Sequence, residues 1–225
     1  MQREILKREK MNINEKFVIT INRELGSGGR TIGRMLAEEL GVPFYDKALI
    51  KALQDKYHLN VDEIEKLKGR DHGWWAEFKR TLSFGLQHNE ARYYQVAIGE
   101  GPDLLTTDEM FKSEQEILKG IADEESCVVA GRSGFYVLRN HPNHISILIQ
   151  ASMDSRVERV ARKQNITEEN ARKIIEKVDK MRENYVNKYT KTSRYDTRNY
   201  DLVISADGKT EDEIVEIILL FIGQK

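Results

Sequence analysis

The residues best suited to chemistry in this sequence lie in a glycine-rich segment near its start. The segment comprises Gly26, Ser27, Gly28, Gly29, Arg30 and Thr31. It follows a short apolar run at residues 17–22 and precedes apolar residues at helical spacing, so we expect it to join a buried strand to a helix. Backbone N–H groups at the start of a helix carry partial positive charge, and glycines let the backbone wrap around an oxyanion. The segment therefore predicts a phosphate-binding loop.

The same segment matches the phosphate-binding pattern G-x-x-x-x-G-K-[ST] in part. Gly29 takes the place of the second glycine, Arg30 that of the lysine, and Thr31 supplies the hydroxyl that would ligate Mg²⁺. Glu24 stands where the first glycine is expected. An arginine also carries positive charge and can bind phosphate oxygens through its guanidinium group. We therefore interpret the segment as a phosphate site with an altered cation.

A second concentration of charge lies in the C-terminal half of the chain. Residues 151–200 contain 13 lysines and arginines against 8 acidic residues, whereas residues 96–127 contain 2 against 9. One expected helix of the basic segment carries Arg156, Arg159 and Arg162, and the next carries Lys177, Asp179, Lys180 and Arg182. On spacing alone, such residues are typical of a solvent-exposed helix face. We favour a different interpretation, in which the two helices are joined by the short turn at residues 164–167 and close over a triphosphate.

Short apolar strands alternate with helical segments along the chain. Buried strands are expected at residues 17–22, 43–45, 127–130, 145–149 and 202–205. Helices are expected at residues 46–57, 110–123, 154–163, 167–189 and 211–222, the last with a capping box from Thr210 to Glu213. Residues 58–105 are rich in aromatic residues and contain no convincing strand, which indicates a mostly helical insertion. The alternation predicts an α/β fold with a five-stranded parallel sheet and helices on both faces.

Charge and composition disfavour several classes of protein. The 36 lysines and arginines and 37 acidic residues leave a net charge of −1, which argues against binding to nucleic acid or to an anionic membrane. No stretch approaches the roughly 20 apolar residues of a membrane span, and residues 1–11 are expected to form a charged leader without an export signal. Cys127 is the single cysteine, so no intrachain disulfide can form, and we expect a buried, unreactive thiol and a cytoplasmic protein.

Together these residues resemble those of the nucleoside monophosphate kinases, and most closely the cytidylate kinase-like family, over about residues 17–221. The resemblance rests on the order and spacing of several motifs. They are the glycine loop with Thr31, the Tyr45-Asp46 pair, Gly131-Arg132, Arg156 after the fourth strand, Asp179 with Arg182, and the run from Tyr200 to Ile204.

The resemblance implies a three-layer fold of the P-loop NTPase type, with a kinase domain at residues 12–225 that includes an acceptor-gripping insertion at 58–105 and a helical lid at 156–198. It also implies that the γ-phosphoryl group of ATP passes, with Mg²⁺, to CMP or dCMP. ATP would be bound by Gly26, Ser27, Gly28, Gly29, Arg30, Thr31 and Arg159, with Thr31 as the metal ligand. Catalysis would involve Arg30, Arg132, Arg156, Asp179 and Arg182. The acceptor would be bound by Asp46, Arg132, Arg156 and Asp179.

Other interpretations of these residues remain open. Ser133, Ala52 and Ile175 stand where such kinases carry an aspartate and two arginines, so the acceptor could be another small metabolite. Asp46 could instead cap the helix that is expected to follow it. The protein could also bind a nucleotide without turnover and use the insertion as a homo-oligomer surface. Nucleic-acid binding through the basic segment is the least supported alternative, because acidic residues interrupt that segment.

Overall fold

The computed structural model describes residues 11–46, 108–131 and 133–223. Four sequence-based expectations lie outside the described residues, in whole or in large part. They concern the leader before residue 11, the helix at 46–57, the insertion at 58–105 and the role of Arg132.

A five-stranded parallel sheet forms the centre of the fold, as the sequence predicts. The strands are β1 (Val18–Arg23), β2 (Phe44–Asp46), β3 (Cys127–Ala130), β4 (His144–Gln150) and β5 (Leu202–Ser205). Their order across the sheet is β2-β3-β1-β4-β5, and every neighbouring pair is parallel. The glycine-rich segment therefore follows the central strand, at the carboxyl edge of the sheet where open α/β sheets bind their ligands.

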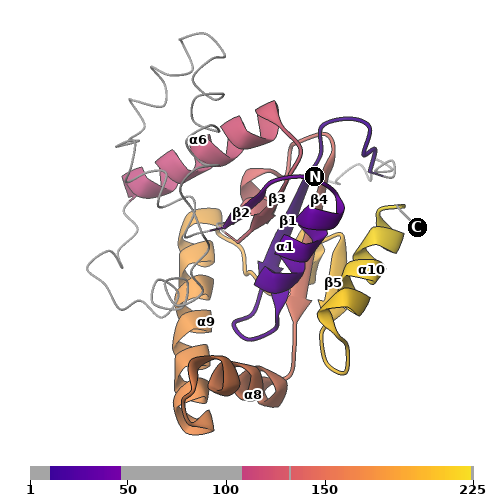
Figure 1. Cartoon of the computed structure of the whole chain (residues 1–225). Coiled ribbons are helices and arrows are strands. Elements are labelled where there is room, and N and C mark those ends of the chain that lie inside the picture. The colour runs from indigo at the N-terminus through magenta and orange to yellow at the C-terminus, as the bar shows by residue number, and fades with distance from the viewer. Residues whose placement is uncertain (1–10, 47–107, 132, 224–225) are drawn as a thin grey trace, which may run out of the picture.

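Helices cover both faces of this sheet (Figure 1). They are α1 (Gly29–Glu39), α6 (Asp108–Glu124), α7 (Gly134–Val137), α8 (Met153–Gln164), α9 (Glu168–Thr190) and α10 (Glu211–Phe221), with the 3₁₀ helix η1 (Thr197–Asn199). Successive strand residues point to opposite faces. In β1, Ile21 lies beneath Gly33 of α1, and its neighbour Thr20 lies beneath Gly134 of α7. Helix α10 contacts α1, and α6 contacts α7, which gives the three layers.

The largest apolar core lies between the sheet and the α1–α10 layer. It includes Ile19, Ile21 and Ile147 from the strands and Leu36 and Ile218 from the helices. Met11, which the sequence assigns to the charged leader, is 8% exposed in this core. Within the part of the chain that the structure describes, no helix is both long and apolar enough to span a membrane.

The sequence predicts the cap of α10 correctly. Thr210 Oγ1 accepts from the backbone N–H of Glu213 at 3.2 Å, and the Glu213 carboxylate accepts from the backbone N–H of Thr210 at 2.7 Å. The prediction that all five strands are buried is wrong for β5. Only Ile204 of that strand is buried, because β5 is an edge strand and Val203 is 36% exposed. Helices α7 and η1 were not predicted, since elements of three or four residues are too short for a periodic pattern.

Helices α8 and α9 form a hairpin with an apolar core of its own. Val157 and Val160 of α8 pack with Ala171, Ile175 and Val178 of α9. Ile175 is fully buried there. Leu25 of the glycine-rich loop belongs to the same cluster. Loop and hairpin therefore share one hydrophobic core, and we call α8 and α9 the hairpin below.

A glycine exchange tests how closely α1 packs on the sheet. A Cβ added at Gly33 would lie 2.9 Å from Cε2 of Phe44 and 3.2 Å from Cδ1 of Ile21. We expect Gly33→Ala to lower the free energy of unfolding by about 1 kcal/mol, because overpacking exceeds the gain in helix propensity. Gly120 of α6 has no such neighbours within 4 Å, so Gly120→Ala should raise that energy by about 0.5–1 kcal/mol. Urea unfolding measures both changes, and equal stabilisation by the two variants would contradict this packing.

Candidate functional site

The loop between β1 and α1 has the backbone shape of an anion cradle. Gly26 and Gly28 have φ angles of 88° and 82°, in the left-handed region that favours glycine. Side chains are excluded at both positions for a second reason. A Cβ at Gly26 would lie 2.8 Å from the carbonyl oxygen of Arg156, and one at Gly28 would lie 3.0 Å from Nη2 of Arg159. Helix α8 thus lies directly against the loop.

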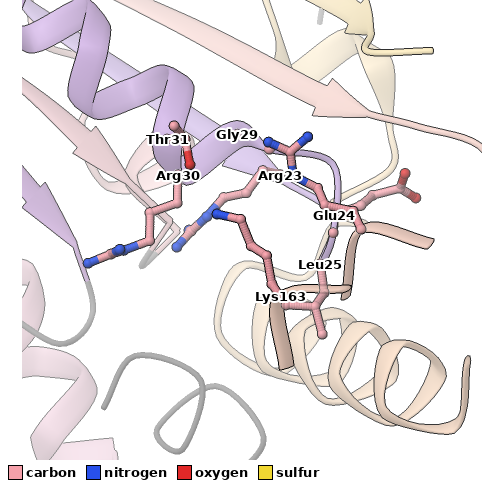
Figure 2. Close-up of a pocket in the computed structure, with 10 residues that line it drawn as sticks. Arg23, Glu24, Leu25, Gly29, Arg30, Thr31 and Lys163 are labelled. Atoms are coloured by element: carbon pink, nitrogen blue, oxygen red, sulfur yellow. The ribbon is translucent and has the colours of Figure 1, made fainter. Parts of the chain in front are cut away.

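A pocket opens above this loop (Figure 2). Its lining contains three arginines, one lysine and one acidic residue. The lining residues are Arg23, Glu24, Leu25, Gly26, Gly28, Gly29, Arg30, Thr31, Arg159 and Lys163. Eight of them belong to or flank the loop, and two come from α8. The pocket sits at the N-terminus of α1, where backbone amides and the helix dipole favour an anion.

Glu24, the residue that departs most from the phosphate-binding pattern, turns away from the cradle. Its Oε2 accepts from the backbone N–H of Ala151 at 3.0 Å and lies 3.7 Å from Nε of Arg156. Figure 2 shows its carboxylate directed away from Arg30 and Lys163. Glu24 therefore ties the loop to the segment after β4 and does not fill the mouth of the pocket.

Arg30 is paired with the buried carboxylate of Asp46. Its Nε donates to Oδ2 of Asp46 at 2.7 Å, and Asp46, the last residue of β2, is fully buried. A carboxylate that is buried away from solvent needs a charged or hydrogen-bonding partner. The sequence assigned Arg30 to the ATP phosphates and Asp46 to the acceptor or to a helix cap. The structure brings the two side chains together between α1 and β2.

One carboxylate, that of Asp179, joins the hairpin to the loop. Its Oδ1 accepts from the backbone N–H of Leu25 at 3.2 Å, and its Oδ2 accepts from Nη1 of Arg156. Nη1 of Arg194 and Nη1 of Arg182 lie 3.8 and 4.0 Å from Oδ1. Three residues that the sequence selected, Arg156, Asp179 and Arg182, thus meet at one point beneath the loop.

Two guanidinium groups also fix the end of β1. Arg182 Nη1 donates to the carbonyl oxygen of Arg23 at 3.3 Å, and Arg194 Nη2 donates to the same oxygen. Arg194 is only 1% exposed. Arg194 was not predicted from the sequence, because it lies between α9 and η1, outside any periodic pattern.

Helix α8 supplies two cations to the pocket. Arg159, which the sequence selected, lies beside Gly28 and is paired with Glu211 at the start of α10. Lys163 lines the pocket, and Figure 2 shows its amine extending toward the loop. Lys163 was missed, although it follows Arg159 at the i+4 spacing that places two side chains on one helix face. Arg162 is exposed and pairs with Glu158 at 3.5 Å.

Thr31 is the residue that the sequence predicts to bind the metal ion. It lies in the first turn of α1 and lines the pocket. Across residues 11–46, 108–131 and 133–223, no group of three or more His, Cys, Asp or Glu side chains is placed to hold a metal ion. A single hydroxyl suits Mg²⁺, which keeps several waters and binds largely through substrate phosphates.

Cys127 plays no part in this site. It is fully buried in β3, and burial raises the pKa of its thiol well above the usual range. The thiolate, which is the nucleophilic form, is therefore disfavoured. This agrees with the expectation of a buried, unreactive thiol.

A stability measurement tests the Arg30–Asp46 pair. Arg30→Met leaves the Asp46 carboxylate buried without this partner, so we expect the free energy of unfolding to fall by about 3 kcal/mol. Adding Asp46→Asn should recover part of that loss, because the buried charge is then removed. Arg198→Met, which breaks the pair at 2.8 Å between Arg198 Nε and Asp196 Oδ1 on the surface, is the matched control and should leave the urea midpoint unchanged. A double variant no more stable than Arg30→Met would contradict the pairing.

Solved structures similar to this chain include the following three. A crystal structure of an uncharacterized protein from Eubacterium ventriosum is 24% identical, with a TM-score of 0.65, and the match covers 93% of this chain and 100% of that one. A shikimate kinase from Bacteroides thetaiotaomicron is 13% identical with a TM-score of 0.49, over 91% of this chain and 96% of that one. A gluconokinase from Sinorhizobium meliloti is 16% identical with a TM-score of 0.49, over 93% and 94% of the two chains.

The first of these structures shows the same fold. A comparison with curated proteins finds no match. The model of the cytidylate kinase-like family matches residues 18–207, which include all five strands, the glycine-rich loop and the hairpin. The chain therefore belongs to the cytidylate kinase-like family.

Proposed function

We propose that this protein is a kinase that transfers the γ-phosphoryl group of ATP, in the presence of Mg²⁺, to a nucleoside monophosphate, with CMP or dCMP as the expected acceptor. Family membership supports a phosphotransferase. The observation that favours ATP most strongly is the convergence of loop amides and cationic side chains on the pocket at the start of α1.

The charge of the pocket suits a polyphosphate. Four cationic residues, Arg23, Arg30, Arg159 and Lys163, line it together with one acidic residue, Glu24. Arg30 and Arg159 are also paired with carboxylates of the protein. The Glu24 carboxylate is held by the backbone N–H of Ala151. Phosphate oxygens would therefore meet positive side chains and backbone N–H groups in the same space.

Phosphoryl transfer requires alignment and charge stabilisation more than covalent help from the protein. An oxygen of the acceptor phosphate attacks the γ-phosphorus, the bond from that phosphorus to the bridging oxygen breaks, and ADP leaves. The loop amides would hold the β- and γ-phosphates, and the Thr31 hydroxyl would hold the metal. Mg²⁺, when bound, neutralises phosphate charge and orients the oxygens. Lys163 and Arg159 would approach from α8.

The residues expected to bind the acceptor are described only in part. Arg132 and the insertion at residues 58–105 lie outside the described residues. Ile175, which stands where related kinases carry an arginine, is fully buried in the hairpin core, so no cation reaches the acceptor from this position. That observation favours, as a second candidate, a kinase that phosphorylates a different small metabolite.

An assay across acceptors tests the proposed function. We expect ADP formation, measured by a coupled assay with ATP and Mg²⁺, when CMP or dCMP is supplied, and slower or no formation with UMP, AMP or GMP. Turnovers between about 1 and 100 per second are typical of kinases. ATP binding without ADP formation for any of these acceptors would reject a nucleoside monophosphate kinase. Selective thermal stabilisation by a non-nucleotide metabolite would then support the second candidate.

A lysine exchange tests the contribution of α8 to ATP binding. Lys163→Met removes a cation from the pocket, and one charged hydrogen bond to phosphate accounts for roughly a tenfold effect. We expect the KM for ATP to rise by about that factor, with the KM for the acceptor unchanged. Lys173→Met is the matched control, because Lys173 is exposed on α9 and pairs with Glu169 at 2.6 Å. An unchanged KM for ATP in Lys163→Met would remove Lys163 from the site.

A further inference from the structure

We infer that Arg23, the last residue of β1, supplies the phosphate-binding cation that the loop pattern would place at Arg30. The inference deepens the proposed function and rests on it for the identity of the ligand, the polyphosphate of ATP. Arg23 lies before the glycines in the sequence, so this cation is at the end of the strand and not at the start of the helix.

The position of Arg30 explains why another cation is needed. The Arg30 Nε donates to the buried Asp46 carboxylate, which holds the guanidinium on the β2 side of the loop. Figure 2 shows the end of this side chain pointing away from Lys163 and Glu24. Arg159 is likewise engaged, since its Nη2 pairs with Glu211. Arg30 and Arg159 are therefore held in place by carboxylates of the protein.

Arg23 occupies the space that these residues leave. It lines the same pocket, it is 7% exposed, and in Figure 2 it lies between Arg30 and Lys163. Its backbone is fixed on both sides. The side-chain Oδ1 of Asn22 accepts from its N–H at 3.0 Å, and the guanidinium groups of Arg182 and Arg194 donate to its carbonyl oxygen.

Two glycines make room for this side chain. A Cβ at Gly29 would lie 2.6 Å from Cβ of Arg23, and a Cβ at Gly131 would overlap the Arg23 guanidinium. Gly29 begins α1, and Gly131 follows β3 with a φ of 83°. The Arg23 side chain thus extends across the carboxyl edge of the sheet, from the loop to the segment after β3, where its guanidinium group lies. Both neighbouring positions must lack a side chain for it to do so.

A buried guanidinium in this place is well suited to phosphate. It presents several N–H donors in a fixed plane and stays charged at every physiological pH. Low exposure strengthens its interaction with an oxyanion, because water screens the charges less. Its fixed backbone also reduces the conformational entropy lost on binding. By contrast, Lys163 reaches the pocket from the surface of α8 through a flexible aliphatic side chain.

Binding of inorganic tripolyphosphate and of ATP, measured by calorimetry on the full chain, tests the assignment without requiring turnover. We expect Arg23→Met to bind both roughly 10- to 100-fold more weakly than the unchanged protein. Arg23→Lys should lose less, because it keeps the charge but not the bidentate geometry. Binding of adenosine should not change. Arg139→Met is the matched control, since Arg139 is exposed, lies outside the pocket and donates to the carbonyl oxygen of Tyr136.

Each result of these binding measurements either supports or overturns the role of Arg23. Tripolyphosphate binding equal in Arg23→Met and the unchanged protein would overturn the inference, and so would an unchanged protein that binds no tripolyphosphate. If Arg23→Met does not fold, Arg23→Lys decides, because the inference requires this variant to bind tripolyphosphate more weakly than the unchanged protein, and equal binding would overturn it. Loss of tripolyphosphate binding together with no turnover of any acceptor by the unchanged protein would support Arg23 and reject the kinase proposal.

Discussion

The carboxylate of Asp179 is the point on which the geometry of the site depends. It accepts from a backbone amide of the loop and attracts the guanidinium groups of Arg156, Arg182 and Arg194. Without a central anion, three like charges in so little solvent would repel one another at considerable cost. Asp179 therefore allows the hairpin to bring several arginines against the loop, and it sets the distance between α9 and β1.

Apolar packing reinforces this electrostatic link. Leu25 lies within the loop, yet its side chain belongs to the core of the hairpin with Val160 and Ile175. A displacement of α8 or α9 would therefore pull on the residue that precedes the first loop glycine. The shape of the loop and the position of the hairpin are consequently linked through these contacts.

Arginines of the basic segment form ion pairs within the protein. Arg156 and Arg159 each have a carboxylate partner within the protein, in Asp179 and Glu211. Arg30 is balanced by Asp46 in the same way. Such pairing keeps guanidinium groups in fixed positions, since a buried charge must be compensated. It also means that a count of basic residues along the sequence overstates the positive charge available to a ligand.

The amino-acid sequence by itself determined the five-stranded parallel sheet, the strand–loop–helix unit with its glycines, the hairpin and the cap of α10, because each depends on local periodicity or on turn chemistry. It also determined the membership of the family. Only the tertiary structure decided how the charged side chains pair. Arg30 meets Asp46 from β2, and Arg194 reaches Arg23 from 171 residues further along the chain. Such pairs arise where the sheet order and the hairpin bring remote segments together, and no spacing along the sequence encodes that meeting.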